Sequence, residues 1–164
     1  MLSAESGYGD RFFYLLLDDT DIVTGRHLTK IPKAVEEVCQ SLDYTPSAVM
    51  ICITCVDALL GTDMDRVCRK SSDRAGVPVV PCYMYALTRE KRLPPMASVR
   101  KSVYSLLKPR KRKSDEVNIL GYFSPLQDDC ELYSLLKSAG VKTIRELSRC
   151  DTFEEYEKMS QANF

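Results

Sequence analysis

AVMICITC, residues 48–55, is the stretch that decides the fold. Its first six residues are apolar without alternation, which is typical of a strand that is buried on both faces of a parallel sheet. Thr54 and Cys55 end the strand, and apolar positions at helical spacing begin at once with Val56. The pattern therefore predicts a buried strand that leads directly into a crossover helix.

Upstream of this stretch, two further segments have the periodicity of regular elements. Phe12–Leu17 is a short apolar run that predicts a strand. From Leu28 to Leu42 the apolar residues recur on one helical face, which predicts a helix. Pro32 is expected in the first turn of that helix, where its missing N–H group costs nothing.

Downstream, the alternation of helix and strand continues. Residues 56–68 keep helical spacing, and residues 77–83 form an apolar run whose two prolines indicate an edge strand or a strand end. The order strand, helix, strand, helix, strand predicts a parallel sheet. We expect strands at 49–53 and 77–82 to be adjacent and parallel, with the helix on Val56–Cys68 crossing between them.

The C-terminal part repeats this alternation on a smaller scale. Residues 117–123 predict a strand, residues 132–136 a helix and residues 141–144 a short strand. Asp151 and Glu154 have the spacing of a capping box, which predicts the start of a last helix.

Together these patterns predict an α/β fold made of Rossmann-like, three-layer α/β/α lobes with parallel sheets. The length of 164 residues and the apolar content of 45% suffice for a buried core. We expect residues 1–114 to form most of a first lobe and residues 115–164 to form the start of a second.

Residues 88–114 differ in charge from the rest of the chain. They hold ten basic residues and one acidic residue, a local charge of +9, so the remainder of this neutral chain carries −9. Ala97–Leu107 predicts a helix, and Pro109–Ser114 predicts a solvated connector. A phosphate-binding patch is the alternative, but the connector has no aromatic residue that could stack on bases. With the overall charge balanced, we expect no specific nucleic-acid partner.

The composition excludes several kinds of site. His27 is the only histidine, so the chain has neither a site built from several histidines nor a choice of bases for a Ser-His-Asp triad. No apolar run approaches the length of a membrane span, and the first residues do not resemble a secretion signal. An odd number of cysteines without an export signal favours a reduced, cytoplasmic setting, in which most of the thiols are buried and inert. The cysteines are Cys39, Cys52, Cys55, Cys68, Cys82, Cys130 and Cys150.

Cys55 is the candidate site residue. It follows a strand and opens a helix, and ligands bind at this edge of open parallel sheets. The free N–H groups and partial positive charge of a helix N-terminus favour the thiolate, which is the form that ligates iron. Cys52, three residues earlier, falls on the opposite face of an extended chain, so a shared metal or disulfide is not expected. A buried structural thiol is the alternative for Cys55.

Several short segments resemble, in order, motifs of the nitrogenase component 1 family. Thr54–Asp63 is similar to the motif T-C-x-x-x-(L/V)-I-G-D-D, with Thr62 in place of the first aspartate. Asp21–Gly25 resembles D-V-V-F-G, Val117–Gly121 resembles V-N-I-I-G, and Leu135–Val141 resembles L-L-x-x-x-G-I. The resemblance covers about residues 10–164, and the order of the segments makes the combination more specific than any one of them.

This resemblance implies a nitrogenase component 1-like oxidoreductase that accepts electrons from an ATP-dependent Fe–S reductase through a bound Fe–S cluster. Cys55 would ligate that iron–sulfur cluster at the boundary with a second nitrogenase-like subunit. We expect the chain to be an internal fragment, because the family's upstream G-P-x-G-C segment, which supplies further ligands, is not in it. The cluster is therefore expected in the full-length parent and not in this fragment.

Two other functions remain open. The parent protein could be a noncatalytic scaffold that holds a metal cluster during assembly, or a small-molecule-binding α/β module without Fe–S chemistry. The sequence assigns no catalytic residue, and the isolated fragment is expected to be inactive.

Overall fold

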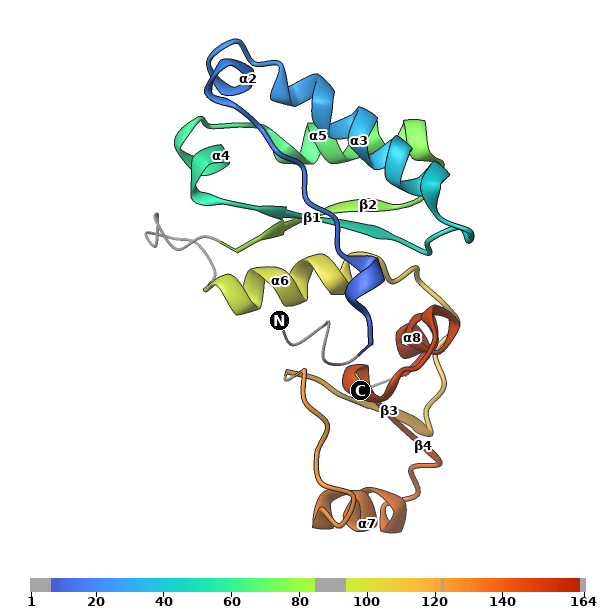
Figure 1. Cartoon of the computed structure of the whole chain (residues 1–164). Helices are drawn as coiled ribbons and strands as arrows, with labels where there is room; N and C mark the ends of the chain where they lie inside the picture. Colours follow the sequence, from blue (N-terminus) through green and yellow to red (C-terminus); the bar gives the residue numbers. More distant parts are fainter. Residues whose placement is uncertain (1–6, 85–93, 122, 163–164) are drawn as a thin grey trace. The chain divides into compact units, whose positions relative to one another are not determined.

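The computed structural model describes residues 7–84, 94–121 and 123–162, which form two compact units, residues 1–92 and 93–164 (Figure 1). Each unit contains a parallel pair of strands with helices packed on it. This confirms the α/β fold with parallel sheets. The placing of the lobe boundary at residue 114 stays a prediction.

The sheet of the first unit pairs β1 (Val49–Ile53) with β2 (Val79–Tyr83) in parallel. The register runs from Val49 opposite Val79 to Ile53 opposite Tyr83. The predicted adjacency and direction of these two strands are therefore confirmed.

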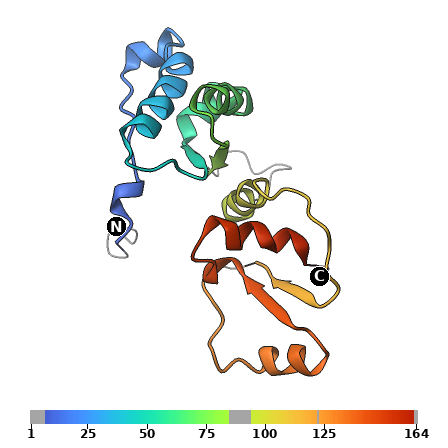
Figure 2. The same cartoon turned by 90° about the vertical axis from the view of Figure 1, so that its right-hand side faces the viewer.

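Two helices, α3 (His27–Ser41) and α5 (Met64–Ala75), cover the same face of this sheet (Figures 1 and 2). The core between them consists of two clusters of buried side chains: Ile31, Ile53, Met64 and Val67 in one, and Val35, Cys68 and Val79 in the other. Because successive strand residues point to opposite faces, Ile51 and Ile53 face these helices.

The expectation that β1 is buried on both faces is wrong. Met50 and Cys52 are exposed, because they alternate with the residues that face the helices. An uninterrupted apolar sequence does not by itself distinguish a strand covered on both faces from one covered on a single face.

The crossover between β1 and β2 contains two helices instead of the single helix expected on Val56–Cys68. A short helix, α4 (Cys55–Leu59), ends where Gly61 takes the left-handed conformation with φ 64°, which favours glycine. Asp63 then caps α5, its side chain accepting a 2.9 Å hydrogen bond from the Arg66 backbone N–H. Gly76, also left-handed, ends α5.

The strand expected at Phe12–Leu17 is absent from the described structure. These residues have an extended backbone that pairs with no described strand, between η1 (Gly9–Arg11) and α2 (Asp19–Val23). An apolar run has the composition of a strand, but a strand forms only where a partner satisfies its N–H and C=O groups.

Pro32 also differs from expectation. Helix α3 begins at His27, so Pro32 lies inside the helix, beyond the first turn, and its ring is buried.

In the second unit, β3 (Glu116–Ile119) and β4 (Thr143–Glu146) form a parallel pair. Figures 1 and 2 show α7 (Glu131–Ser138) on one side of this pair and α8 (Phe153–Lys158) on the other, an α/β/α arrangement. The remaining elements of the unit are α6 (Pro95–Tyr104), η2 (Leu147–Arg149) and η3 (Met159–Gln161). The predicted strand at 117–123 is shorter than expected, and residue 122 lies outside the described residues.

The cap of α8 is shifted by one residue from the predicted Asp151–Glu154 pair. Thr152 is the N-cap and accepts a hydrogen bond from the Glu155 backbone N–H at 3.2 Å. Glu155 in turn accepts a 2.9 Å hydrogen bond from the Asp151 backbone N–H.

Two buried carboxylates join elements of the second unit. Glu116 of β3 is paired with Arg145 of β4 at 2.5 Å, and this hydrogen bond lowers the pKa of Glu116. Burial alone would raise the pKa of Glu146, but hydrogen bonds from Tyr133, from the Leu126 backbone N–H and from Arg149 outweigh burial and lower it. Each carboxylate is thus stabilised in its charged form by residues from other segments.

The connector at 109–114 is exposed, as expected. A residue near each of its ends contacts the C-terminal elements of the same unit. Arg110 pairs with Glu157 of α8 at 2.7 Å, and the Lys113 backbone N–H donates to the Gln161 carbonyl at 2.8 Å. Lys111 and Arg112 between them make no ion pair within the described residues. The basic residues at 89–92 lie outside the described residues.

Acidification should lower the free energy of unfolding, because Glu116 and Glu146 both have lowered pKa values in the folded chain. A carboxyl group with a lowered folded pKa contributes its full stabilisation above its unfolded pKa and loses it as the pH falls through the folded value. With an ordinary glutamate value of 4.5, we expect stability in urea unfolding to fall once the pH drops below that value.

Glu116→Gln should cost about 1–3 kcal/mol at pH 7, as expected for lost hydrogen bonds to a charged group, and should weaken the pH dependence. Glu37→Gln is the matched control, because Glu37 forms an exposed i,i+4 pair with Lys33 and such pairs contribute less than about 1 kcal/mol. An unaltered pH dependence in Glu116→Gln would contradict the assignment.

The exposed basic connector should bind duplex DNA weakly, through phosphate contacts alone. We expect affinity to fall steeply between low and physiological salt, because counterion release is then the main driving force. Fluorescence anisotropy with labelled duplexes of unrelated sequence measures this, with Lys111→Ala/Arg112→Ala as the variant. Submicromolar affinity for one defined sequence at physiological salt would show that this prediction is wrong.

Candidate functional site

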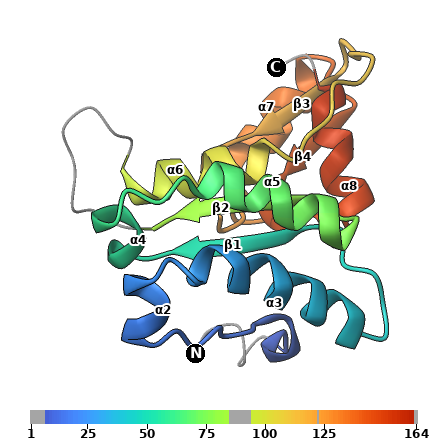
Figure 3. The same ribbon diagram turned by 90° about the horizontal axis from the view of Figure 1, so that it is seen from above.

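Cys55 lies at the carboxyl end of β1, where the chain turns from the sheet into α4. Thr54 has an extended backbone, with φ −94° and ψ 177°, and Cys55 is the first residue of the helix. Figures 1 and 3 show α2 and α4 at the same end of the first unit, the end at which β1 terminates. The predicted position of Cys55, at a strand end and a helix start, is therefore present in the structure.

A small pocket of about 130 Å³ lies beside this turn. It is lined by Ile53, Asp57, Ala58, Gly61, Thr62, Met64 and Tyr83. The Tyr83 hydroxyl donates to Asp65 of α5 at 3.1 Å, which joins the end of β2 to the start of α5. The pocket is large enough for a few water molecules, and Cys55 is not among its lining residues.

The Gly61-Thr62-Asp63 segment has a structural explanation that does not involve a ligand. Gly61 provides the left-handed turn, the Thr62 backbone N–H donates to the Asp57 carbonyl at 3.1 Å, and Asp63 caps α5. Thr62, the residue that departs from the motif, uses its backbone in these contacts. The departure therefore leaves the geometry of the turn intact.

The seven thiols differ in exposure. Cys52 and Cys55 are exposed, Cys68 and Cys82 are buried, and Cys39, Cys130 and Cys150 lie between these extremes. Burial raises the pKa of Cys68 to about 12 and of Cys82 to about 11, and it also raises the pKa values of Cys39 and Cys150. These four thiols are therefore protonated at neutral pH, as expected of inert core residues.

Cys52 is one of the two exposed thiols, although most of the seven were expected to be buried. It lies in register with Cys82 of β2, but its side chain is exposed on the sheet face that α3 and α5 leave uncovered.

The donor set at this edge fits an Fe–S cluster only in part. Across residues 7–84, 94–121 and 123–162, no group of three or more histidine, cysteine, aspartate or glutamate side chains could hold a metal ion. Cys55 offers one accessible thiol, whereas a cluster takes four ligands as a rule. The remaining ligands would have to come from outside the described residues.

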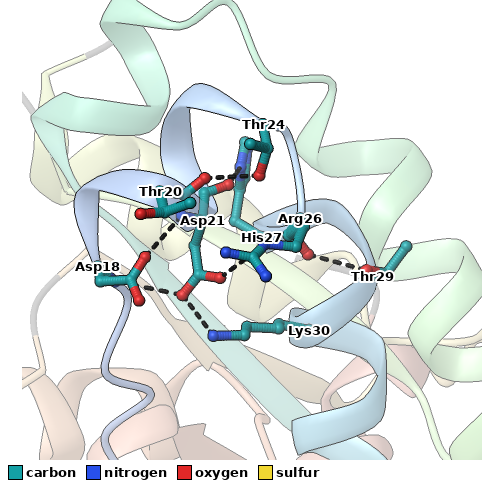
Figure 4. Close-up of polar contacts among 8 residues, drawn as sticks. All are labelled: Asp18, Thr20, Asp21, Thr24, Arg26, His27, Thr29 and Lys30. Atoms are coloured by element: carbon teal, nitrogen blue, oxygen red, sulfur yellow. Dashed lines mark hydrogen bonds and ion pairs between the residues drawn. The ribbon is translucent and has the colours of Figure 1, made fainter.

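An ionic cluster around the buried Asp21 lies beside the entry to α3 and was not predicted from the sequence (Figure 4). Asp21, 1% exposed, accepts a hydrogen bond from Lys30 and lies 3.5 Å from the Arg26 guanidinium. The hydrogen bond from Lys30 lowers the pKa of the Asp21 carboxyl. Asp18 and Asp21 also form a reciprocal capping box at the start of α2.

The signal for this cluster was present in the sequence as the spacing Asp18-x-x-Asp21, which is a capping spacing. It explains the Asp21–Gly25 segment structurally, because Asp21 fixes α2 against α3. The His27 Nδ1 atom lies 3.2 Å from the Asp21 carbonyl, so the buried side chain of the single histidine is part of the same cluster.

Comparison with known proteins identifies the family. The model of the nitrogenase component 1 type oxidoreductases matches residues 3–164, so the chain belongs to that family. This confirms the resemblance drawn from the sequence motifs.

Individual relatives match over most of this chain. The nitrogenase iron-molybdenum cofactor biosynthesis protein NifE of Rhizobium meliloti (strain 1021) is 33% identical over 125 residues, 74% of this chain and 26% of that protein. The nitrogenase molybdenum-iron protein alpha chain of Methanosarcina barkeri is 29% identical over 168 residues, 97% of this chain and 31% of that protein. The chain thus spans about a quarter to a third of the length of these relatives.

A solved structure of nitrogenase Cp1 at pH 6.5 resembles the chain with a TM-score of 0.60 at 22% identity, covering 89% of this chain and 28% of that one. This likeness supports the α/β fold. None of the helices in the described part of the chain has the length and apolar character of a membrane span.

Cys52 and Cys55 should react with iodoacetamide faster than Cys39 or Cys68 in the native chain. The reagent reaches an exposed thiol easily, whereas burial blocks the reagent and keeps the thiol protonated. Peptide mass spectrometry after a timed pulse measures the labelling of each site, and the urea-unfolded chain, in which all sites are equally accessible, is the control. Equal native rates at Cys55 and Cys68 would contradict the burial assigned to Cys68.

Proposed function

We propose that the chain is the segment of a nitrogenase component 1-like protein in which Cys55 ligates an Fe–S cluster. The observation that supports this is an exposed thiol at the carboxyl end of β1, on the residue that matches the cysteine of the family's T-C motif. When bound, such a cluster supplies one-electron transfer. Within this chain, the β1–β2 pair and Gly61 fix the position from which the thiol projects.

The surroundings of Cys55 favour a cluster at a boundary with a second nitrogenase-like subunit. Three side chains of the α4 region next to it are large, apolar and exposed: Val56, Leu59 and Leu60. Exposed apolar groups gathered beside a potential ligand are typical of a surface that a protein partner covers. The second subunit, or residues outside those described, would supply the remaining ligands.

Two roles are compatible with such a cluster. An oxidoreductase role, in which the cluster accepts electrons from an ATP-dependent Fe–S reductase, agrees with the match to the Methanosarcina barkeri alpha chain over 97% of this chain. A scaffold role in cofactor assembly agrees with the match to cofactor biosynthesis proteins named NifE, at up to 33% identity. The identities of the NifE relatives, 22–33%, lie on both sides of the 29% of the alpha chain, so both roles stand as proposals.

The edge that carries Cys55 gives no support to the third function, a small-molecule-binding module. The pocket at the sheet edge, about 130 Å³, is well below the volume of a site for a drug-sized ligand.

In the full-length parent, purified anaerobically with its partner, Cys55→Ala should lose cluster iron and the Fe–S absorption band. Cys52→Ala is the matched control, because Cys52 is also an exposed thiol and lies three residues away. It should retain the iron and cost less than about 1 kcal/mol of stability, as is usual for surface substitutions. Full iron occupancy in Cys55→Ala would remove Cys55 from the site.

The same preparations separate the two roles. An oxidoreductase should turn over substrate when the reductase partner and ATP are supplied, whereas a scaffold should retain its cluster and pass a metal cofactor to an acceptor protein without turnover. The isolated 164-residue chain should purify without iron, since no group of three or more potential ligand side chains could hold a metal ion among residues 7–84, 94–121 and 123–162.

A further inference from the structure

Two cysteines stand opposite each other across the parallel pair of the first unit. Cys52 of β1 is in register with Cys82 of β2, and Figure 3 shows the two strands side by side. The next pair along the strands, Ile53 and Tyr83, packs in the core cluster under α3 and α5. Because successive strand residues point to opposite faces, both cysteine side chains lie on the other face of the sheet.

The two thiols also influence each other. Both are free, and Cys52 is exposed whereas Cys82 is buried. Burial raises the pKa of Cys82 to about 11, and the Cys52 thiol adds to this shift through its charge and a side-chain hydrogen bond. The helices α4 and α5 separate the two cysteines in the sequence, so it is the strand pairing that brings the thiols together.

We propose that Cys52 and Cys82 form a reversible disulfide across the β1–β2 pair. Neighbouring strands lie about 4.8 Å apart, and the Cα atoms of a disulfide are usually about 4.4–6.8 Å apart, so the strand pairing already provides this spacing. Within the described residues, no third potential ligand joins the two thiols to make a metal site, and zinc takes four ligands as a rule. The pair therefore favours a disulfide over a metal ion.

The difference in exposure gives each thiol its own step in the exchange. The thiolate of the exposed Cys52 attacks a small-molecule disulfide such as glutathione disulfide, and one glutathione thiol leaves. The thiolate of Cys82 then attacks the Cys52 sulfur of this mixed disulfide, and the second glutathione thiol leaves. Two protein thiols are thus oxidised to one disulfide, while the two electrons and two protons pass to glutathione disulfide, which becomes two thiols.

This order of steps agrees with Cys82 being a core residue that reagents do not reach. Its sulfur reacts only with the neighbouring Cys52, which carries the mixed disulfide to it. The bond is reversible because its Cys52 sulfur is exposed, so that a small thiol can attack there and reopen it. The proposal does not depend on a cluster at Cys55, since neither thiol is a ligand of that site.

The first test locates the bond in the unaltered 164-residue chain after equilibration with glutathione disulfide and glutathione. The remaining thiols are alkylated in urea, and peptide mass spectrometry should recover Cys52 linked to Cys82. A bond from Cys52 to Cys55 would overturn the proposal. So would a Cys52 that carries only bound glutathione in excess glutathione disulfide, because Cys82 would then have failed to complete the exchange.

The second test compares Cys52→Ser with Cys55→Ser, the matched control that removes the other exposed thiol three residues away. Each variant has six cysteines in place of seven. Cys55→Ser should lose two protons of mass on oxidation and regain them with dithiothreitol, as the unaltered chain does, whereas Cys52→Ser should form no internal disulfide. Circular dichroism shows whether both variants keep their fold. An internal disulfide that persists in Cys52→Ser or disappears in Cys55→Ser would overturn the proposal.

The third test asks whether the fold brings the thiols together. In urea the strands separate, so the Cys52–Cys82 bond should need roughly ten-fold more glutathione disulfide, at equal glutathione, than it needs in the native chain. Mass spectrometry of the linked peptides measures the oxidised fraction in both conditions. Equal oxidation of the native and the unfolded chain would show that strand pairing does not favour the bond, and it would overturn the proposal.

Discussion

The packing of α5 against the parallel pair β1–β2 is the interaction on which the rest of the first unit depends. Ile53, the last residue of β1, is buried against Met64 and Val67 of α5, and Tyr83 packs on the same cluster. Because Ile53 precedes Thr54-Cys55 directly, this contact fixes the point at which the chain leaves the sheet. The position of Cys55 is therefore set by the burial of Ile53, two residues earlier, and not by contacts of its own side chain.

Much of this arrangement could be predicted from the sequence because it rests on periodicity and order. The parallel pairing of 49–53 with 77–82 followed from two apolar runs separated by a helical pattern, and the position of Cys55 followed from that pairing. Periodicity could not reveal the break at Gly61, because apolar residues on both sides of a left-handed turn keep a helix-like spacing. It also could not show that Cys52 is exposed, since burial depends on which faces other elements cover.

The apolar run Phe12–Leu17 illustrates the same limit. Its composition predicts a strand, yet pairing is a property of two segments, and no described segment lies in register with it. The burial of the carboxylates Asp21, Glu116 and Glu146 was not predicted either, because each has a partner nine to 29 residues away and a charged residue in a sequence is most often solvated. Long-range pairing, in backbone and in charge, is what the sequence pattern leaves undetermined.

The T-C motif region combines one residue available for chemistry with several that are structural. Gly61 and Asp63 shape the turn and cap α5, and their roles are complete within this chain. Cys55 has no comparable role, because its side chain is exposed and packs in no core cluster. We propose that an exposed cysteine in this position, at the carboxyl edge of a parallel sheet, binds a ligand. The family to which the chain belongs makes a metal cluster the ligand to test first.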